Sequence, residues 1–320
     1  TPTTLTPEQM SYFLQSVKNY FPHRSPDFEC SMEANPGTVD LEKLQAMKEG
    51  GVNRISFGVQ SFDDHLLGGI GRIHNTEDVY RSIELARRAG FTNISIDLMF
   101  GLPNQTLQHV EQSVTRALAL ELPHYSIYSL KVEENTLFHK LYERDELPLP
   151  DEDTELAMYE WIMERFAKAG YEQYEISNFA RSGYACRHNV TYWRNESYYG
   201  IGAGAHGYVG RQRHVNVKGV SEYIEATKQG LPRLSIEDVE EHEAMEDFMM
   251  VGLRMLGGVS ERDFYRQFHR SIDEIFGPTL NRLCERGLLE RCVEGYRLSR
   301  QGLIFGNEVF GAFIGTTQSA

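Results

Sequence analysis

The feature that most constrains the fold is a short apolar run in which every second residue is small or polar. The run lies in residues 51–62 (GVNRISFGVQSF), where large apolar side chains alternate from Ile55 to Val59. Turn residues bracket the run on both sides, and it ends on the amide side chain of Gln60. A run this short with this spacing predicts a buried β-strand rather than a helix.

Four further segments share the strand-like pattern, and helix-like segments separate them. The other predicted strands are residues 28–35, 93–101, 124–130 and 171–176, the last of which we expect to be the final strand of a barrel. The predicted helices are residues 4–20 with a capping box at Thr6 and Gln9, residues 41–49, one helix capped by Thr76, one capped by Thr106, and residues 151–169. Strand followed by helix, four times over, predicts an α/β fold with a parallel sheet or barrel.

Polar side chains lie near the carboxyl ends of three predicted strands, at Glu33, Gln60 and Asp97. Ligands of parallel α/β proteins bind at such ends, so these three residues could converge on one small polar ligand. Arg72, in the loop GGIGRIH, could pair with a ligand carboxylate. Plainer interpretations stay open, namely strand-end groups satisfied by the backbone and a surface arginine. Asp97 is the most informative of the four, because a carboxylate in an apolar run is costly to bury without a partner.

The charge balance and the cysteines exclude some classes of protein. Lysine plus arginine number 32 and aspartate plus glutamate 46, giving a net charge of −14, which argues against a non-specific nucleic-acid binder. No apolar stretch approaches the roughly 20 residues of a membrane span. The four cysteines, Cys30, Cys186, Cys284 and Cys292, lack metal-site spacing. We therefore expect reduced thiols in a cytoplasmic protein without a metal motif of its own.

An irregular, aromatic and glycine-rich stretch follows the predicted barrel strands, over residues 178–210. Long loops of this kind are more often functional than structural. Its segment HNVTYW brings His188 close to Tyr192 and Trp193, a set that could ligate a haem iron or stack on a tetrapyrrole. The alternative is a core histidine with aromatic packing. His206, in AGAHG, is a second candidate.

The C-terminal part turns helical, and we expect a domain boundary between residues 1–218 and 219–320. The predicted elements are helices at 237–256, 260–268 and 272–286, a hairpin of 288–292 with 295–298, and a closing helix at 300–313. This order is typical of a small winged-helix domain. Because the chain is acidic, we expect a packing module or lid rather than a DNA reader.

Five motifs in a fixed order resemble one known family. They are SMEANPGT (31–38), ISFGVQSFDD (55–64), GRIH (71–74), IDLMFGLP (96–103) and YEISNFA (174–180). Each motif is ordinary alone, but together they resemble the HemN/HemW group of radical S-adenosylmethionine proteins, over essentially the whole chain. The resemblance implies a partial (β/α)6 barrel with a C-terminal helical domain.

The resemblance also implies a cofactor and its ligands. Glu33 and Asp97 would hold the ribose and adenosyl part of S-adenosylmethionine, and Gln60 and Arg72 the methionine part. In this group a CxxxCxxC motif after the first barrel strand binds a [4Fe–4S] cluster. The chain begins with TPTTLTPEQ, which resembles the end of a GGGTPT stretch just after that motif. We therefore expect a truncated sequence that lacks the first strand and the cluster cysteines, and that does not cleave S-adenosylmethionine.

Two branches of the group offer two functions. HNVTYW (188–193) fits the HNxxYW motif of HemW-type haem chaperones, which implies haem bound at His188, with Tyr192 and Trp193 beside the macrocycle, and passed to an acceptor protein. The other branch is the oxygen-independent coproporphyrinogen III oxidase, which converts propionates to vinyl groups in porphyrin biosynthesis. The chaperone is the favoured prediction. A third hypothesis is a winged-helix interaction module on an inactive barrel that binds neither ligand.

Overall fold

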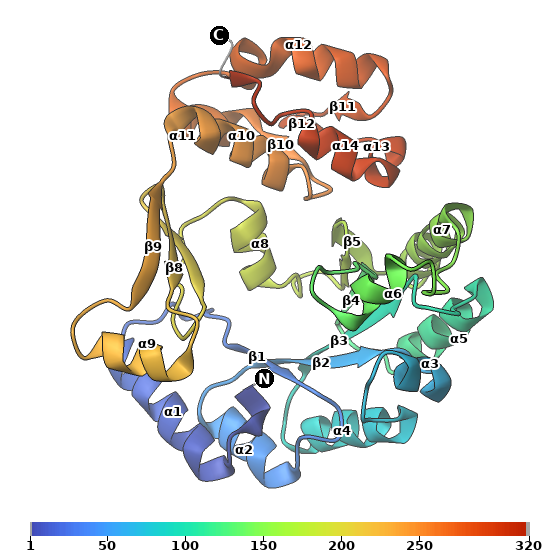
Figure 1. The fold of residues 1–320 in the computed structure, drawn as a ribbon, viewed down its shortest axis with the longest axis vertical. Coiled ribbons are helices and arrows are strands. Elements are labelled where there is room, and N and C mark those ends of the chain that lie inside the picture. Colours follow the sequence, from blue (N-terminus) through green and yellow to red (C-terminus); the bar gives the residue numbers. More distant parts are fainter. Residues whose placement is uncertain (1, 318–320) are drawn as a thin grey trace. The chain divides into compact units, whose positions relative to one another are not determined.

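The computed structural model describes residues 2–317 and divides into two compact units, Thr1–Ala185 and Cys186–Ala320 (Figure 1). The predicted domain boundary after residue 218 stays a prediction, because a compact unit and a family domain can end at different residues.

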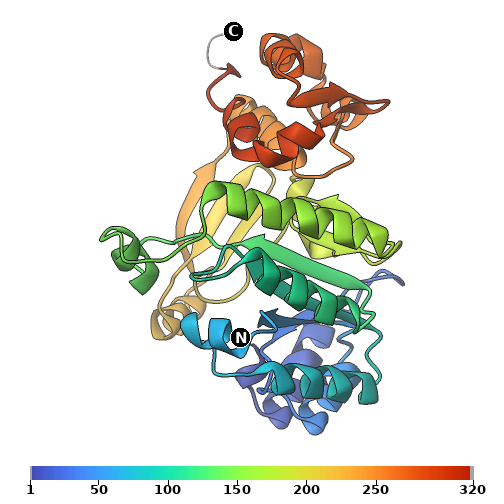
Figure 2. The ribbon, with the colours of Figure 1, turned by 90° about the vertical axis from the view of Figure 1, so that its right-hand side faces the viewer.

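The first unit is a β-sheet with α-helices along one face (Figure 1). Its strands are β1 (Ser31–Ala34), β2 (Arg54–Gln60), β3 (Asn93–Phe100), β4 (His124–Ser129), β5 (Glu172–Glu175) and β6 (Asn178–Ala180). Its helices are η1 (Pro2–Thr4), α1 (Pro7–Tyr20), α2 (Leu41–Glu49), α3 (Asp64–Gly69), α4 (Thr76–Arg88), α5 (Leu107–Leu118), α6 (Leu137–Tyr142) and α7 (Glu152–Lys168). Helices α5 and α7 pack side by side (Figure 2).

The order of strands confirms the predicted α/β class and corrects one strand. The sheet runs β1-β2-β3-β4-β6-β5, and its first four strands are parallel. The segment predicted as the last barrel strand is β5, but β5 does not pair with β4. Instead β6 lies between them, antiparallel to both, in a part of the chain that we expected to be irregular. β5 and β6 form a tight hairpin, in whose turn the Glu175 carboxylate accepts the backbone N–H of Ser177 at 3.0 Å.

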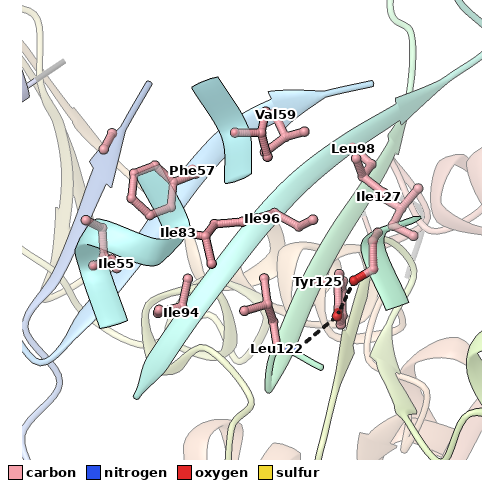
Figure 3. Close-up of a cluster of buried hydrophobic side chains, with 14 of the residues drawn as sticks. Ile55, Phe57, Val59, Ile83, Ile94, Ile96, Leu98, Leu122, Tyr125 and Ile127 are labelled. Carbon is pink, nitrogen blue, oxygen red and sulfur yellow. Dashed lines mark hydrogen bonds between the residues drawn. The ribbon is translucent and has the colours of Figure 1, made fainter. Parts of the chain in front are cut away.

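The core of the first unit lies between the apolar face of the sheet and the helices (Figure 3). Ile55, Phe57 and Val59 of β2 are fully buried there, as the alternating run predicted. Tyr125 of β4 is also fully buried and keeps its hydroxyl satisfied, accepting the Leu122 backbone N–H at 3.0 Å and donating to a helix carbonyl. The apolar alternation therefore leaves the other face of the sheet to small and polar residues.

Side-chain caps define where the helices begin. The predicted capping box of α1 is present, since Thr6 and Gln9 each bond to the backbone of the other. Thr106 caps α5 as predicted. The prediction was off by one residue at α4, where Asn75 is the cap and Thr76 is the first helical residue. The Thr76 hydroxyl donates to Asp64 instead, at 2.7 Å.

The second unit holds two three-stranded antiparallel sheets and the remaining helices. Its strands are β7 (His206–Val209), β8 (Gln212–Asn216), β9 (Arg233–Asp238), β10 (Val259–Ser260), β11 (Leu289–Arg291) and β12 (Gly295–Leu298). Its helices are α8 (Arg187–Trp193), α9 (Val220–Thr227), α10 (Glu241–Gly252), α11 (Glu261–Phe268), α12 (Ile272–Glu285), α13 (Arg300–Ile304) and α14 (Gly306–Gly311).

The C-terminal elements follow the predicted winged-helix-like order, with differences. A short strand, β10, joins the predicted hairpin. The helix expected from residue 237 begins at Glu241, because the preceding residues form β9. The closing helix is broken into α13 and α14 at Phe305. The sheet β7-β8-β9 was not predicted at all.

A buried carboxylate on α10 holds residues 315–317 in place. Glu246 is 9% exposed and accepts the backbone N–H groups of Gly315 at 2.8 Å and Thr317 at 3.0 Å, together with the Thr317 hydroxyl. Burial alone would raise the pKa of this carboxyl, but these hydrogen bonds outweigh burial and leave the pKa lowered. A carboxyl with a lowered pKa stabilises the fold above its unfolded-state pKa, and this contribution is lost as pH falls through the folded pKa.

We expect Glu246→Gln to lower the free energy of unfolding at pH 7 by about 1.5–3 kcal/mol, the usual worth of hydrogen bonds to a charged group. The deficit should shrink below about pH 4.5, as the parent carboxylate is protonated. Urea denaturation followed by circular dichroism checks both points. Glu285→Gln, at an exposed position on α12, is the matched control. Equal stability of the Glu246→Gln protein and the parent at pH 7 would contradict the fastening role.

Candidate functional site

The polar face of the first sheet carries side chains in register across its strands. Residues that pair across a sheet point to the same face. One row consists of Glu33, Ser56, Ser95 and His124, and the next of Gly58, Asp97, Ser126 and Asn178. Glu33 is exposed at the carboxyl end of β1. The register therefore brings two of the predicted ligand residues, Glu33 and Asp97, to the same face.

Asp97 is held by hydroxyl groups from the strands on either side. Ser56 of β2 donates to its carboxylate at 3.1 Å, and Ser126 of β4 also hydrogen-bonds to it. Burial nevertheless raises the pKa of this carboxyl, and the neighbouring charge of Glu33 raises it further. A carboxylate whose charge costs free energy in the folded protein is typical of a functional site.

Gly58 and Gln60 shape the space beside Asp97. The ladder between β2 and β3 shifts register between them, and Gln60 adopts a left-handed backbone conformation with φ at 68°. Such a conformation is uncommon for glutamine and costs free energy that the surrounding structure must offset. A Cβ on Gly58 would lie 3.1 Å from the Gln60 amide nitrogen and 3.4 Å from the Asn35 amide oxygen. The glycine thus lets the amide side chains of Gln60 and Asn35 lie close to the strand beside Asp97, where a larger residue would displace them.

Arg72 reaches back to the same strand ends. Its guanidinium donates to the amide oxygen of Asn35 at 3.2 Å. His74 is buried two residues later and bonds the Val59 carbonyl at 3.1 Å, which fixes the loop that carries Arg72. Asn35 was missed as a site residue. The sequence indicated Asn35 only by its place two residues after Glu33, because its contacts with Arg72 and Gly58 depend on the fold.

A second polar network lies at the amino-terminal end of the same face. His124 is fully buried and contacts Ser95 at 2.8 Å, Arg54 at 3.3 Å and the Tyr174 hydroxyl at 2.9 Å. Burial, and then the charge of Arg54, hold the pKa of His124 well below its usual value, so the ring is neutral at pH 7. Sequence analysis did not single out these residues.

In the second unit, α8 displays His188 and Tyr192 on one side. The two are four residues apart, and their rings meet edge to face with centroids 4.7 Å apart and planes at 88°. His188 is exposed and Tyr192 is half-buried. Burial, and then the neighbouring Tyr198, raise the pKa of the Tyr192 phenol, so it stays protonated at neutral pH.

Trp193 lies on another side of α8, about 140° around the helix from His188. The guanidinium of Arg254 stacks on its ring, with the guanidinium carbon 4.3 Å from the ring centre. The same carbon lies 5.8 Å from the centre of the Phe310 ring. Trp193 lines a cavity of about 820 Å³ with Phe248 and Met255, among others, and its indole N–H has no hydrogen-bond partner. The structure thus brings His188 and Tyr192 together and places Trp193 apart from them. His206, at the start of β7, is exposed.

Residues 2–317 contain no group of three His, Cys, Asp or Glu side chains that could hold a metal ion. The four cysteines are free thiols. The described residues therefore do not fit a [4Fe–4S] cluster.

Family models match segments in both the N-terminal and the C-terminal half of the chain. The model of the Radical SAM superfamily matches residues 1–117, and that of the HemN C-terminal domain matches residues 239–305. The Heme chaperone HemW of Bacillus subtilis (strain 168) is 47% identical over 316 residues, covering 98% of this chain and 83% of that protein. This chain belongs to the HemW family. The HemW of Escherichia coli (strain K12) is 34% identical, over 98% of this chain and 82% of that protein.

A solved structure supports the fold of this HemW-family chain. Coproporphyrinogen III oxidase (HemN) from Escherichia coli matches with a TM-score of 0.82 at 20% identity, covering 98% of this chain and 76% of that one. At this identity the likeness shows the fold alone. Between residues 2 and 317, the HemW-family chain has no helix long and apolar enough to cross a membrane.

We expect Asp97→Asn to raise the free energy of unfolding at pH 7, by about 0.5–2 kcal/mol, the range common for stabilising substitutions. The reason is that a raised pKa makes the charged carboxylate unfavourable in the folded state, while asparagine can still accept from Ser56. The gain should shrink as pH falls through the raised pKa, because the parent carboxyl then becomes neutral as well. Urea denaturation at pH 7 and pH 5 measures the difference.

Asp145→Asn, at an exposed position, is the control and should stay within about 0.5 kcal/mol of the parent. If Asp97→Asn destabilises the protein while the control does not, the carboxylate has a structural role.

Proposed function

We propose that this chain binds haem at His188 and passes it to an acceptor protein. Relatives that are 47% and 34% identical over 98% of the chain are named heme chaperones. The observation that carries the proposal is an exposed imidazole on α8 whose ring is held edge to face by Tyr192. A neutral imidazole nitrogen is a common ligand of haem iron.

The two aromatic neighbours of His188 have different parts in this proposal. Tyr192 would not compete for the iron, because its raised pKa keeps it a protonated phenol. It supports the imidazole and offers a ring to the macrocycle. Trp193 packs under Arg254 and holds α8 to the C-terminal helices of the unit. Its predicted place beside the macrocycle stays a prediction.

We also propose that the first unit binds S-adenosylmethionine, which would supply an adenosyl–sulfonium group when bound. Its polar face offers groups that such a molecule could bind, because the amides of Gln60 and Asn35 lie over Gly58 beside Asp97, at the carboxyl end of β2. Glu33 and Asp97 would accept hydrogen bonds from the ribose hydroxyls. Gln60 and Arg72 would hold the amino-acid end, since an arginine pairs with a carboxylate.

The oxidase is the less favoured alternative. Its support here is the likeness to a coproporphyrinogen III oxidase at 20% identity, which concerns the fold. HNVTYW, by contrast, fits the chaperone branch. We further propose a cytoplasmic location, which four free thiols support, because thiols stay reduced in that compartment.

A titration with hemin, followed by the Soret band, tests the haem site. We expect a saturable one-to-one complex with the parent and an affinity at least about tenfold lower for His188→Ala, because the ligand to the iron is lost. His206→Ala tests the second candidate, and we expect it to bind as the parent does. His65→Ala, an exposed histidine of the first unit, is the matched control. Parent-like binding by His188→Ala would remove His188 as the ligand.

Calorimetric titration with S-adenosylhomocysteine tests the second proposal without need of a cluster. Gly58→Ala should weaken binding by about tenfold or more, since the added methyl group would push the amide side chains of Gln60 and Asn35 out of their places beside Asp97. Gly68→Ala is the control, because a methyl group there meets no atom within 4 Å. Equal affinities of the Gly58→Ala and parent proteins would mean that the ligand does not lie beside Asp97.

A further inference from the structure

Three aromatic rings in contact run from the exposed histidine of α8 towards the sheet of the second unit. His188 meets Tyr192 edge to face, with centroids 4.7 Å apart. Tyr192 in turn meets Tyr198, with centroids 4.5 Å apart and planes at 74°. Both pairs have the edge-to-face geometry that the charge distribution of aromatic rings favours. The His188 imidazole therefore packs on the Tyr192 ring, which in turn packs on the Tyr198 ring.

The backbone that carries the Tyr198 ring is fixed to β7. Its N–H donates to the Tyr208 carbonyl at 2.7 Å, and the Tyr208 N–H donates to its carbonyl at 2.9 Å. Two residues further on, Gly200 lies so close to β7 that a Cβ would stand 2.2 Å from the carbonyl oxygen of His206. Tyr198 therefore offers Tyr192 a support that cannot shift without breaking contacts with the sheet.

Helix α8 depends on such support. It has seven residues, none of them buried, and its N-cap residue Cys186 makes no side-chain capping bond. Helices this short are unstable in water by themselves, so side contacts must hold α8 in place. One contact is Trp193 with Arg254, away from His188. The contact of Tyr192 with Tyr198 lies on the side that carries the histidine.

A turn after α8 brings Tyr198 back to the helix. Asn195 adopts a left-handed conformation with φ at 52°, which asparagine tolerates better than most residues. Its backbone N–H donates to the Tyr192 carbonyl at 3.0 Å. The chain thus reverses within three residues of Tyr192, which explains how residues six positions apart come to stack.

We propose that Tyr198 is a positioning residue for haem binding, which sets the plane of the His188 imidazole through its contact with Tyr192. The inference rests on the proposed function, since it takes His188 as the iron ligand. Groups behind a metal ligand orient it, and their loss weakens metal binding even though they never touch the metal. Tyr198 would act in this way through ring packing, so its hydroxyl is dispensable and its ring is not.

The experiment compares Tyr198→Leu, Tyr198→Phe and the parent as full chains loaded with ferric haem. Two readouts are used, the rate of haem transfer to excess apomyoglobin and the electron paramagnetic resonance spectrum of the iron. We expect about two- to tenfold faster release from Tyr198→Leu, the range that corresponds to one lost aromatic pair, together with a broadened iron signal. Tyr198→Phe should match the parent. Tyr199→Leu, the 75% exposed neighbour, is the matched control and should also match it.

A double variant separates positioning from general loosening. Tyr192→Leu should speed release as Tyr198→Leu does, and combining the two should add little, because both break one series of contacts. Should Tyr198→Leu fail to fold, Tyr192→Leu makes the same break one ring closer to His188 and carries the same expectation. Parent-like release and an unchanged spectrum in the leucine variants would overturn the proposal, as would a Tyr198→Phe protein that releases haem as fast as Tyr198→Leu.

The two proposals fail in different ways. If His188→Ala weakens haem binding but Tyr198→Leu changes neither readout, the positioning role is wrong and the haem site stands. If His188→Ala binds haem as tightly as the parent, the ligand assignment fails, and the inference about Tyr198 falls with it.

Discussion

The first unit depends on the pairing of Gly58 with Asp97 across two central strands. Large apolar residues occupy one face of these strands and pack the helices, which leaves the other face to serine, glycine and a carboxylate. Because the residue beside Asp97 is glycine, the amide side chains of Gln60 and Asn35 can lie against the strand there. The same register supplies the serine hydroxyls that make a charged Asp97 tolerable. Packing on one face and the proposed ligand site on the other thus follow from a single alternation.

In the second unit, the proposed haem ligand His188 lies on a helix that is too short to be stable by itself. Two contacts hold α8 in place on different sides, namely the stack of Trp193 on Arg254 and the packing of Tyr192 on Tyr198. The spacing within HNVTYW serves this arrangement, because positions 188 and 192 share a side and position 193 does not. The motif therefore contains the proposed ligand, His188, and also the residues Tyr192 and Trp193, which hold its helix in place.

The sequence was sufficient to predict the elements in which apolar periodicity is strong. Runs such as Ile55 to Val59 predicted the parallel strands and the α/β class, and Thr6 and Thr106 marked helix starts correctly. Weak periodicity explains the failures. Strand β6 has three residues, all of them buried, and β9 is exposed along its whole length, so neither shows the alternation of a half-buried strand.

The candidate site was predictable in part, for the same kind of reason. Position at a strand end led to Glu33, Gln60 and Asp97, whereas the contact of Asn35 with Arg72 depends on how a loop folds back. The separation of Trp193 from His188 could have been foreseen, because five residues along a helix correspond to about 140°.

The chain has two tryptophans, Trp161 on α7 in the first unit and Trp193 on α8 in the second. Each unit therefore carries its own intrinsic fluorophore. Haem quenches tryptophan emission strongly at short range, and Trp193 lies about 1.4 helical turns from the proposed ligand His188. If haem binds at His188 as proposed, the emission of Trp193 should fall on binding and recover on release, so that both events can be followed without any attached dye.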